Sequence, residues 1–572
     1  MKKNLLALAL LVGITATADA RERSVAEMQK AAISVLGHRA GVKGAPANAQ
    51  SLKVLKKAQQ LTVLGTQDGG FAVIANDDAF SPVLGYSDSK FSDNHAPGFL
   101  WWMDTMNKAL AQSLADGNVD NTVHRAAEYK DAVPQLLTTT WGQDAPFNNL
   151  TPEYTDKTNG KVHYVTGCVA TAMSMIMHYH RYPQHGMGER SYRFTPGDGT
   201  SAAMTLTANF EDTYYDWDNM LDSYEAGKYN EAQANAVATL MYQCGVAVKM
   251  TYTADGSGAY STEACKALRN YFRYNGWIKC YNRTYFPKDE FMNLVYRELN
   301  DGCPILFGGQ STSGGHEFIF DGYNEQGLVH VNWGWNGTDN GYYDIAQLHG
   351  YSSGQELVEV RDSTDTRFKG YYRSYWGTDK AIKITRSGST GVNISSDGIY
   401  NLDVDDFTGN ICLMAMDQKN GEKQLVAVVL NTPKTTSNRG VAVNASADIS
   451  SLRDGDYRLY LATYANGKGD LKDTDYQPVR SPENVSNSAL VTIEGGEIAS
   501  LKTDRSGNWT ATGIAQITNN RPAYEDCMVR VYDTMGRMVY SSQKSLFNIN
   551  DVPAKGVLIV KTGDSTQKVV KQ

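Results

Sequence analysis

The chain has 572 residues, of which 41% are hydrophobic and 20% are charged, and its formal net charge is −8. This length exceeds what one hydrophobic core supports, so several domains are expected, and the composition excludes a disordered or fibrous protein. No cluster of lysine and arginine is long enough to follow a phosphate backbone, which argues against a nucleic-acid partner.

Residues 1–20 have the pattern of an export signal. Lysines at positions 2 and 3 precede an apolar run over residues 5–14, and Ala18-Asp19-Ala20 has the small residues at which signal peptidase cuts. The apolar run is too short to span a bilayer, and no later stretch approaches about 18 continuous apolar residues. We therefore expect cleavage after Ala20 and a mature protein that is exported.

A first unit is expected between residues 21 and 125. Apolar spacing predicts a helix over 23–37 and the start of another at 99–103, and apolar runs predict strands at 70–75 and 81–86. The polar stretch 115–130 has the composition of a linker.

The next unit, to about residue 385, mixes helical and strand patterns. Helices are predicted over 168–180, 231–249, 261–273 and 288–299, and strands over 316–323, 327–333 and 380–385. This is an α+β pattern.

From 390 to 495 short alternating strands lie between Gly, Asp and Asn turns, as in a β-sandwich. Residues 500–572 are also rich in strands.

Seven scattered cysteines raise two alternatives, buried thiols or disulfides. An exported chain favours pairing, but the number is odd and there is no CxxC motif. We favour buried unpaired thiols for six of them, with the seventh as a candidate reactive thiol.

Cys168 is that candidate, because it follows Gly167 at the start of a predicted helix. The free N–H groups and the positive dipole end of a helix favour a thiolate, so we expect a lowered thiol pKa. The alternative is a small core residue at the start of a buried helix.

A histidine and an asparagine downstream complete a possible catalytic set. His316 follows two glycines, Gly314 and Gly315, at the head of an apolar strand, where a backbone or substrate can approach closely. Asn332 can fix the tautomer of an imidazole, as in a Cys-His-Asn arrangement. Each residue alone is better explained by core packing, but the combination favours catalysis.

Other residues are expected around this set. The backbone N–H of Cys168 and the side chain of Gln143 are candidate donors to an oxyanion. The loop 255–260, with Ser257 and Gly258, is predicted to wall a substrate cleft, although a plain turn is an equal alternative.

Several motifs together resemble the streptopain family of papain-like cysteine proteases. They are Leu136-Leu137-Thr138-Thr139-Thr140-Trp141-Gly142-Gln143, Pro146-Phe147-Asn148, Thr166-Gly167-Cys168-Val169-Ala170-Thr171-Ala172, Gly315-His316 and Asn332-Trp333-Gly334-Trp335. The resemblance covers the chain to about residue 385. It implies a papain-like catalytic domain of two subdomains, preceded by an α+β propeptide that inhibits the enzyme until it is removed.

The resemblance also implies the residue roles. Cys168 is the nucleophile, His316 the base, Asn332 its orienting partner, Trp333 its shield and Gln143 an oxyanion-hole donor. Substrate-binding residues are expected at Ser257, Gly258, Gly314, Gly315 and Trp335. The substrates are proteins and peptides with a hydrophobic residue at P2, and no cofactor or metal is needed.

Glu317 departs from the family pattern, in which a small apolar residue usually follows the histidine. Its charge can raise the pKa of His316, but strand alternation is expected to point it away from the cleft. We expect Glu317 to affect the pH optimum of the enzyme rather than its activity as a protease.

The C-terminal strands resemble a different kind of domain, the sorting domain of type IX secretion cargo. Residues 528–537, 556–561 and 568–571 carry this resemblance, which implies outer-membrane secretion machinery as a partner and a secreted or bacterial cell-surface location. The predicted organisation is then a signal peptide (1–20), inhibitory propeptide (21–125), papain-like catalytic domain (126–388), Ig-like β-sandwich (389–495) and sorting domain (496–572).

The sequence also offers alternatives to a cysteine protease, namely a serine hydrolase, a metal site, a binding protein and a surface adhesin. The G-x-S-x-G pattern at 350–354 lacks the core strand of a serine-hydrolase elbow, and His178, His180 and His185 lack the spacing of a metal site. A binding protein that kept the scaffold predicts a Cys168 inert to alkylation. A surface adhesin predicts binding that survives Cys168→Ala.

Overall fold

The computed structural model describes two compact units, residues 1–508 and 509–572, which are treated separately. The described residues are 21–37, 48–121, 125–156, 158–196, 202–254, 256–311, 314–348, 354–365, 374–465, 476–504, 528–532, 538–543, 549, 552, 556–562 and 565–571. The expected signal peptide and the G-x-S-x-G serine lie outside them. None of the described helices has the length and apolar character needed to cross a membrane.

The N-terminal unit, residues 21–121, has two helices, α1 (Val25–Leu36) and α2 (Pro97–Ala115), and an antiparallel sheet on which α1 packs. Helix α1 begins at Ser24, whose side chain forms a capping box with Glu27. Its buried residues Met28, Ala32 and Leu36 share a core with the strands. The strands are β1 (Lys53–Lys57), β2 (Leu61–Gly65), β3 (Phe71–Ala75) and β4 (Val83–Ser87).

This sheet continues without a break into the next part of the chain. Strand β4 pairs with β15, and the ten-stranded sheet has the order β1-β2-β3-β4-β15-β14-β13-β12-β16-β11. The added strands are β11 (Cys280–Asn282), β12 (Ile305–Ser311), β13 (Gly314–Tyr323), β14 (Val329–Asn332), β15 (Gly341–Tyr343) and β16 (Glu356–Val358). The expected boundary at residue 125 therefore divides segments that share one sheet.

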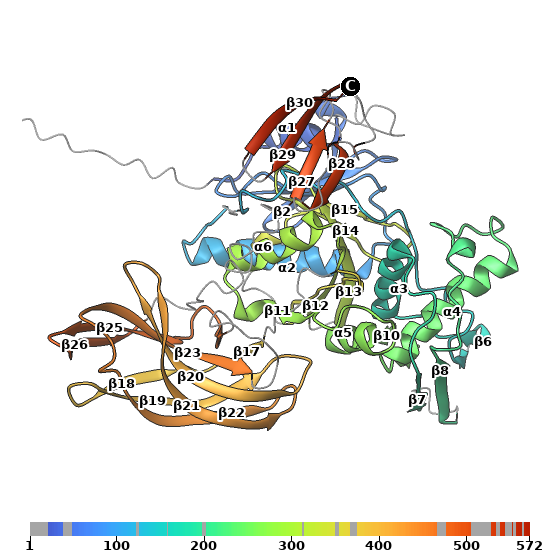
Figure 1. The fold of residues 1–572 in the computed structure, drawn as a ribbon. Coiled ribbons are helices and arrows are strands. Elements are labelled where there is room, and N and C mark those ends of the chain that lie inside the picture. The colour runs from blue at the N-terminus through green and yellow to red at the C-terminus, as the bar shows by residue number, and fades with distance from the viewer. Residues whose placement is uncertain are drawn as a thin grey trace, which may run out of the picture. The chain divides into compact units, whose positions relative to one another are not determined.

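Helices cover both faces of the central strands. Helices α2 (Pro97–Ala115) and α6 (Lys288–Asn300) pack on the face of β12 and β13 that carries Phe307 and Phe318 (Figure 1). The opposite face carries Leu306 and Ile319, which belong to the core around α3 (Cys168–His180).

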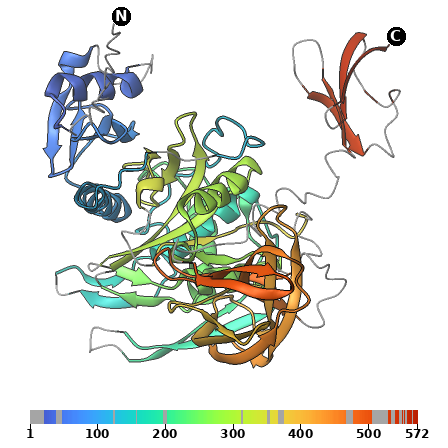
Figure 2. The same ribbon diagram turned by 90° about the vertical axis from the view of Figure 1, so that its left-hand side faces the viewer.

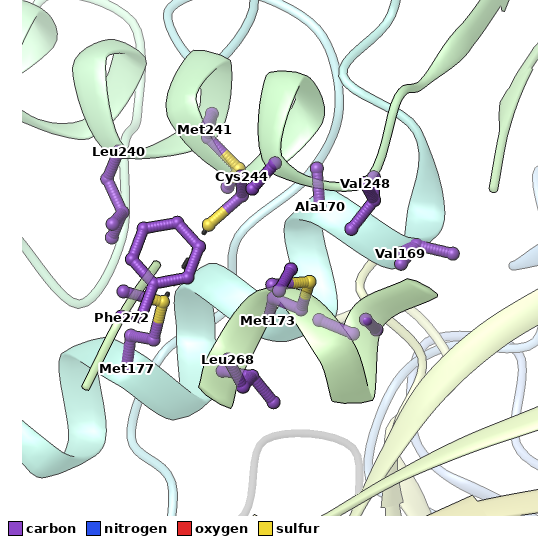
Figure 3. Packing of buried hydrophobic residues seen from close by; sticks show 14 of the residues in the cluster. Val169, Ala170, Met173, Met177, Leu240, Met241, Cys244, Val248, Leu268 and Phe272 are labelled. Atoms are coloured by element: carbon purple, nitrogen blue, oxygen red, sulfur yellow. Dashed lines mark hydrogen bonds between the residues drawn. The ribbon is translucent and has the colours of Figure 1, made fainter. Parts of the chain in front are cut away.

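Helix α3 is the centre of the second layer. It packs against α4 (Glu231–Ala247) and α5 (Ser261–Asn270), and the contacts involve Met173, Met177, Cys244 and Phe272 (Figure 3). Residues 169–177 of α3 are all buried, which agrees with the unbroken apolar run predicted there. Short hairpins flank this layer: β5 (Glu153–Asp156) with β6 (Gly160–His163), β7 (Glu189–Phe194) with β8 (Met204–Asn209), and β9 (Thr251–Thr253) with β10 (Gly256–Gly258).

A β-sandwich follows, and it is longer than expected. One sheet joins β17 (Trp376–Gly377), β18 (Lys383–Ser387), β19 (Gly391–Asn401) and β22 (Gly440–Asp448). The other joins β20 (Phe407–Asp417), β21 (Lys423–Thr435), β23 (Gly455–Ala465), β24 (Gln477–Pro478), β25 (Ser488–Glu494) and β26 (Glu497–Thr503). The predicted limits 389–495 are wrong at both ends, because β17, β18 and β26 pair with sandwich strands.

The sandwich lies against the catalytic part (Figure 2), and buried ion pairs cross between them. Lys279 of the catalytic part lies 2.5 Å from Asp403, with both side chains 2% exposed. Arg480 of the sandwich lies 2.7 Å from Glu290. Trp277 also packs on the sandwich core.

The described cysteines are free thiols, as predicted. Cys244, Cys265, Cys280, Cys303 and Cys412 are buried, and burial raises the pKa of the Cys244 and Cys265 thiols to about 12. Cys527 lies outside the described residues.

In the C-terminal unit, the described strands form a four-stranded sheet of order β28-β27-β29-β30. The strands are β27 (Met528–Tyr532), β28 (Met538–Gln543), β29 (Gly556–Thr562) and β30 (Ser565–Lys571). Strands β27, β29 and β30 lie in or overlap the segments 528–537, 556–561 and 568–571 of the sequence analysis, and β28 was not predicted.

The buried pair between Lys279 and Asp403 gives a first prediction. Lys279→Met removes the cation and leaves a buried carboxylate, so we expect the free energy of unfolding to fall by about 3–5 kcal/mol. Denaturant and thermal unfolding followed by circular dichroism measure the change. Lys90→Met, which breaks an exposed pair with Asp68, is the control and should change stability by less than about 1 kcal/mol. If Lys279→Met and Lys90→Met lowered the free energy of unfolding by the same amount, the buried pair would not stabilise the protein more than an exposed one.

Candidate active site

Cys168 is the first residue of α3, as predicted, and Gly167 shapes the turn into the helix. Gly167 has φ 88°, and a Cβ there would lie 2.7 Å from Met250 Sδ and 2.8 Å from the Ser257 carbonyl oxygen. Only glycine combines this conformation with such close neighbours. The result is a half-buried thiol at a helix N-terminus.

The Cys168 thiol is not ionised by this placement, contrary to the sequence prediction. Its pKa is raised to about 11, mainly by burial, and the charge of the nearby Glu317 carboxyl acts in the same direction. Hydrogen bonds from the backbone N–H of Glu317 and of Val169 lower it, but desolvation is the larger effect. The sulfur is therefore a neutral thiol at neutral pH in this structure.

His316 and Cys168 border the same cavity, which has a volume of about 590 Å³. They approach it from opposite faces of the sheet. His316 pairs with Gly309, and a Cβ on Gly309 would collide with the indole of Trp101 on α2. The pleat thus puts His316 on the α2 face, with Phe318, while Cys168 lies on the α3 face.

Within the part of the chain that the structure describes, no hydrogen bond joins the His316 ring to another group. The ring is half-buried, and burial lowers its pKa. The Cys168 and His316 side chains are thus near each other but are not a hydrogen-bonded pair.

Asn332 and Trp333 are buried next to β13 but have partners other than His316. The Asn332 amide donates to the Thr139 carbonyl oxygen at 2.8 Å and accepts from the Gly334 N–H at 3.1 Å. Trp333 donates to the Asp339 carbonyl oxygen and packs on Phe318. Neither residue bonds to His316 within the described part of the chain, so both roles stay predictions.

Gln143 lies in the loop before α3, and its carbonyl oxygen accepts from the Thr166 N–H at 3.1 Å. The side chain is 9% exposed. Gln143 is not among the residues that line the cavity, so the oxyanion role stays a prediction.

Two of the predicted substrate-binding residues, Gly258 and Gly315, line the cavity. The other three, Ser257, Gly314 and Trp335, are not among the lining residues: Ser257 is buried, Gly314 is exposed and Trp335 is half-buried. Ala259 and Tyr260 also line the cavity, so the loop does wall it.

Glu317 is the main correction to the sequence interpretation. It was expected to point away from the cleft, yet its side chain lies on the α3 face, lines the cavity and acts on the Cys168 thiol. The side chains of β13 do alternate, but the strand places Glu317 on the α3 face and His316 on the α2 face. Glu356 and Ser261, which lie beside Glu317, were missed because no local motif marks them.

No group of potential metal ligands occurs among the described residues. His178 and His180, considered as ligands, instead contact the Met220 carbonyl oxygen and the Tyr274 hydroxyl.

Comparison with known proteins shows which family of enzymes has a similar sequence. Residues 141–343 match the model of the Peptidase C10 family. Streptopain from Streptococcus pyogenes is 29% identical over 345 residues, covering 57% of this chain and 86% of that protein. The thiol protease/hemagglutinin PrtT from Porphyromonas gingivalis is 30% identical over 320 residues, covering 51% of this chain and 36% of that protein.

A solved structure extends the similarity to the N-terminal unit. A prointerpain A fragment from Prevotella intermedia is 40% identical, with a TM-score of 0.50 over 54% of this chain and 97% of that chain. The protein is therefore a cysteine-type endopeptidase with a papain-like α+β fold, made as a zymogen. It belongs to the peptidase C10 family.

The raised thiol pKa predicts how Cys168 reacts. In the full-length chain, the rate of alkylation of Cys168 by iodoacetamide should rise with pH toward a midpoint of about 11. Glu317→Gln removes a negative charge that disfavours the thiolate, so the midpoint should move to lower pH. Mass spectrometry of the modified peptide measures the rate, and Cys168→Ala reports reaction at other thiols. A wild-type midpoint near the usual thiol pKa of about 8.5 would contradict the burial argument.

Proposed function

We propose that the protein is a secreted cysteine endopeptidase in which Cys168 is the nucleophile and His316 the general base. The observation that carries this proposal is that both residues border one cavity, with the sulfur at the start of a helix. Substrates are proteins and peptides.

The proposed reaction is acyl transfer. The Cys168 sulfur attacks the carbonyl carbon of the peptide bond, after its proton passes to His316. The N–H of Cys168 and the side chain of Gln143 stabilise the oxyanion. His316 then gives its proton to the leaving amine, and water hydrolyses the thioester. Asn332 orients the imidazole and Trp333 shields that hydrogen bond.

We propose that the N-terminal unit inhibits the enzyme through α2. Trp101 is 4% exposed, donates to the Gln310 carbonyl oxygen at 3.0 Å and packs on Phe318. These contacts hold β12 and β13 in the arrangement that keeps His316 on the α2 face. Removal of the unit would free the strands to bring the imidazole to the sulfur.

For the cavity, the resemblance predicted a hydrophobic side chain at P2. The buried side chains of Val169 and Val248, with Ala259, supply an apolar wall for such a group.

For the C-terminal unit, we propose a sorting role toward outer-membrane secretion machinery, which the strand pattern of residues 528–571 supports.

Self-maturation tests the assignment of the nucleophile. Full-length wild type, incubated under reducing conditions, should lose the segment that ends near residue 125, and Cys168→Ala should stay intact because it has no nucleophile. Gel electrophoresis and N-terminal sequencing measure the change. If both proteins shorten alike, Cys168 does not cleave the chain.

Trp101→Ala tests the proposed inhibition. Loss of a buried indole weakens packing by about 3–5 kcal/mol, so α2 should release β12 and β13 more readily. The full-length variant should mature faster than wild type in a time course under reducing conditions. Leu100→Ala, at a 42% exposed position on the same helix, is the control. Unchanged maturation of Trp101→Ala would count against α2 as the inhibitory element.

A further inference from the structure

Two buried threonine hydroxyls bond to the turn that leads into α3. Thr166 is 0% exposed and Thr171 is 1% exposed. The Thr171 hydroxyl donates to the Gly167 carbonyl oxygen at 3.1 Å, and its oxygen lies 2.8 Å from the Thr166 hydroxyl oxygen. Since the proton of Thr171 is used for Gly167, Thr166 supplies the proton between the two hydroxyls. A chain of hydrogen bonds therefore runs from Thr166 through Thr171 to Gly167.

This chain of hydrogen bonds fixes the orientation of the peptide group between Gly167 and Cys168. The Gly167 carbonyl oxygen accepts from the Thr171 hydroxyl and also from the Thr171 backbone N–H, at 3.0 Å. A trans peptide group is planar, so its C=O and N–H bonds point in opposite directions. Holding the Gly167 oxygen toward α3 therefore holds the Cys168 N–H pointing out of the helix start, where N–H groups have no partner within the helix.

The other end of the chain of hydrogen bonds reaches the second candidate donor to the oxyanion. The Thr166 N–H donates to the Gln143 carbonyl oxygen at 3.1 Å. On the other side of Gln143, the fully buried Trp141 donates its indole N–H to the Leu221 carbonyl oxygen at 2.7 Å. The backbone of Gln143 is thus tied to the same turn that orients the Cys168 N–H.

The position of these hydroxyls favours a role in geometry over a role in packing. A threonine hydroxyl that bonds to the carbonyl four residues earlier does not stabilise a helix, and apolar packing needs no hydroxyl. Buried polar groups that satisfy one another make their surroundings rigid. Neither threonine belongs to β12 or β13, so the arrangement does not depend on the strand movement proposed for maturation.

We propose that the hydroxyl pair of Thr166 and Thr171 positions the oxyanion hole of the protease. Thr171 sets the direction of the Cys168 N–H, and Thr166 sets the position of Gln143. Neither threonine lines the cavity, so both are positioning residues. This inference rests on the proposed function of Cys168 and Gln143, and it adds the residues that hold the two donors in place.

Thr171→Val tests the inference, because valine keeps the branched shape and lacks the hydroxyl. The self-matured enzyme is assayed with a fluorogenic peptide that has leucine at P2. We expect kcat to fall at least about tenfold, with KM changed by less than about twofold, because the oxyanion exists only in the transition state. Thr171→Ser restores the hydroxyl and should recover most of kcat.

A second variant and a matched control complete the design. Thr166→Val should also lower kcat, and it replaces Thr171→Val if circular dichroism shows that this variant does not fold. Thr213→Val is the control, because the Thr213 hydroxyl also donates to the carbonyl oxygen four residues earlier, at Asn209, and accepts from the Gln243 amide. Thr213 does not line the cavity, so its variant should leave kcat and KM unchanged.

Gln143→Ala distinguishes failure of the inference from failure of the proposed function. Alone it should lower kcat at least about tenfold, and adding Thr166→Val should then lower kcat little further, because Thr166 acts through Gln143. Effects that multiply in full in the double variant contradict this role of Thr166. If Gln143→Ala lowers kcat but both threonine variants behave like Thr213→Val, the positioning inference is wrong and the protease assignment stands. Peptide cleavage that persists in Cys168→Ala overturns the assignment of the nucleophile itself.

Discussion

The register of β12 against β13 determines which side chain meets the cysteine. Gly308 is paired with Glu317 and Gly309 with His316, so the glutamate faces α3 and the histidine faces α2. A shift by one residue would exchange the two faces. The register is held by buried apolar residues on both sides, with Ile319 in the α3 core and Phe318 against Trp101. Whether Glu317 or His316 faces the α3 side therefore depends on the packing of apolar side chains that take no part in the proposed reaction.

The same sheet connects the N-terminal unit with the catalytic part, as the proposed inhibition requires. Because β4 pairs with β15, the strands of the N-terminal unit extend the catalytic sheet, and α2 is held against β12 and β13. The Cys168 thiol is meanwhile kept neutral by burial. The raised pKa of the thiol and the position of the imidazole on the α2 face both follow from the closed packing around the sheet.

Buried charges have two contrasting roles in this chain. Lys279 and Asp403 form a completed pair where the sandwich meets the catalytic part, and such a pair is costly to break but has little tendency to bind anything else. Glu317 has a hydroxyl on one oxygen and no donor on the other. The first is a complete ion pair, and the second is a buried carboxyl group with one oxygen that accepts no hydrogen bond.

The local elements and the family could be predicted from the order of the amino acids alone. The apolar run after Gly167 predicted α3, the motifs around Cys168, His316 and Asn332 identified the class of enzyme, and the scattered cysteines predicted free thiols, because each of these signals is carried by neighbouring residues. Three facts became visible only in the folded chain: Glu317, and not His316, faces the α3 side, Glu356 lies beside Glu317, and the sandwich starts at β17. These facts depend on which strands pair and in which register, and pairing between distant segments leaves no local pattern in the sequence.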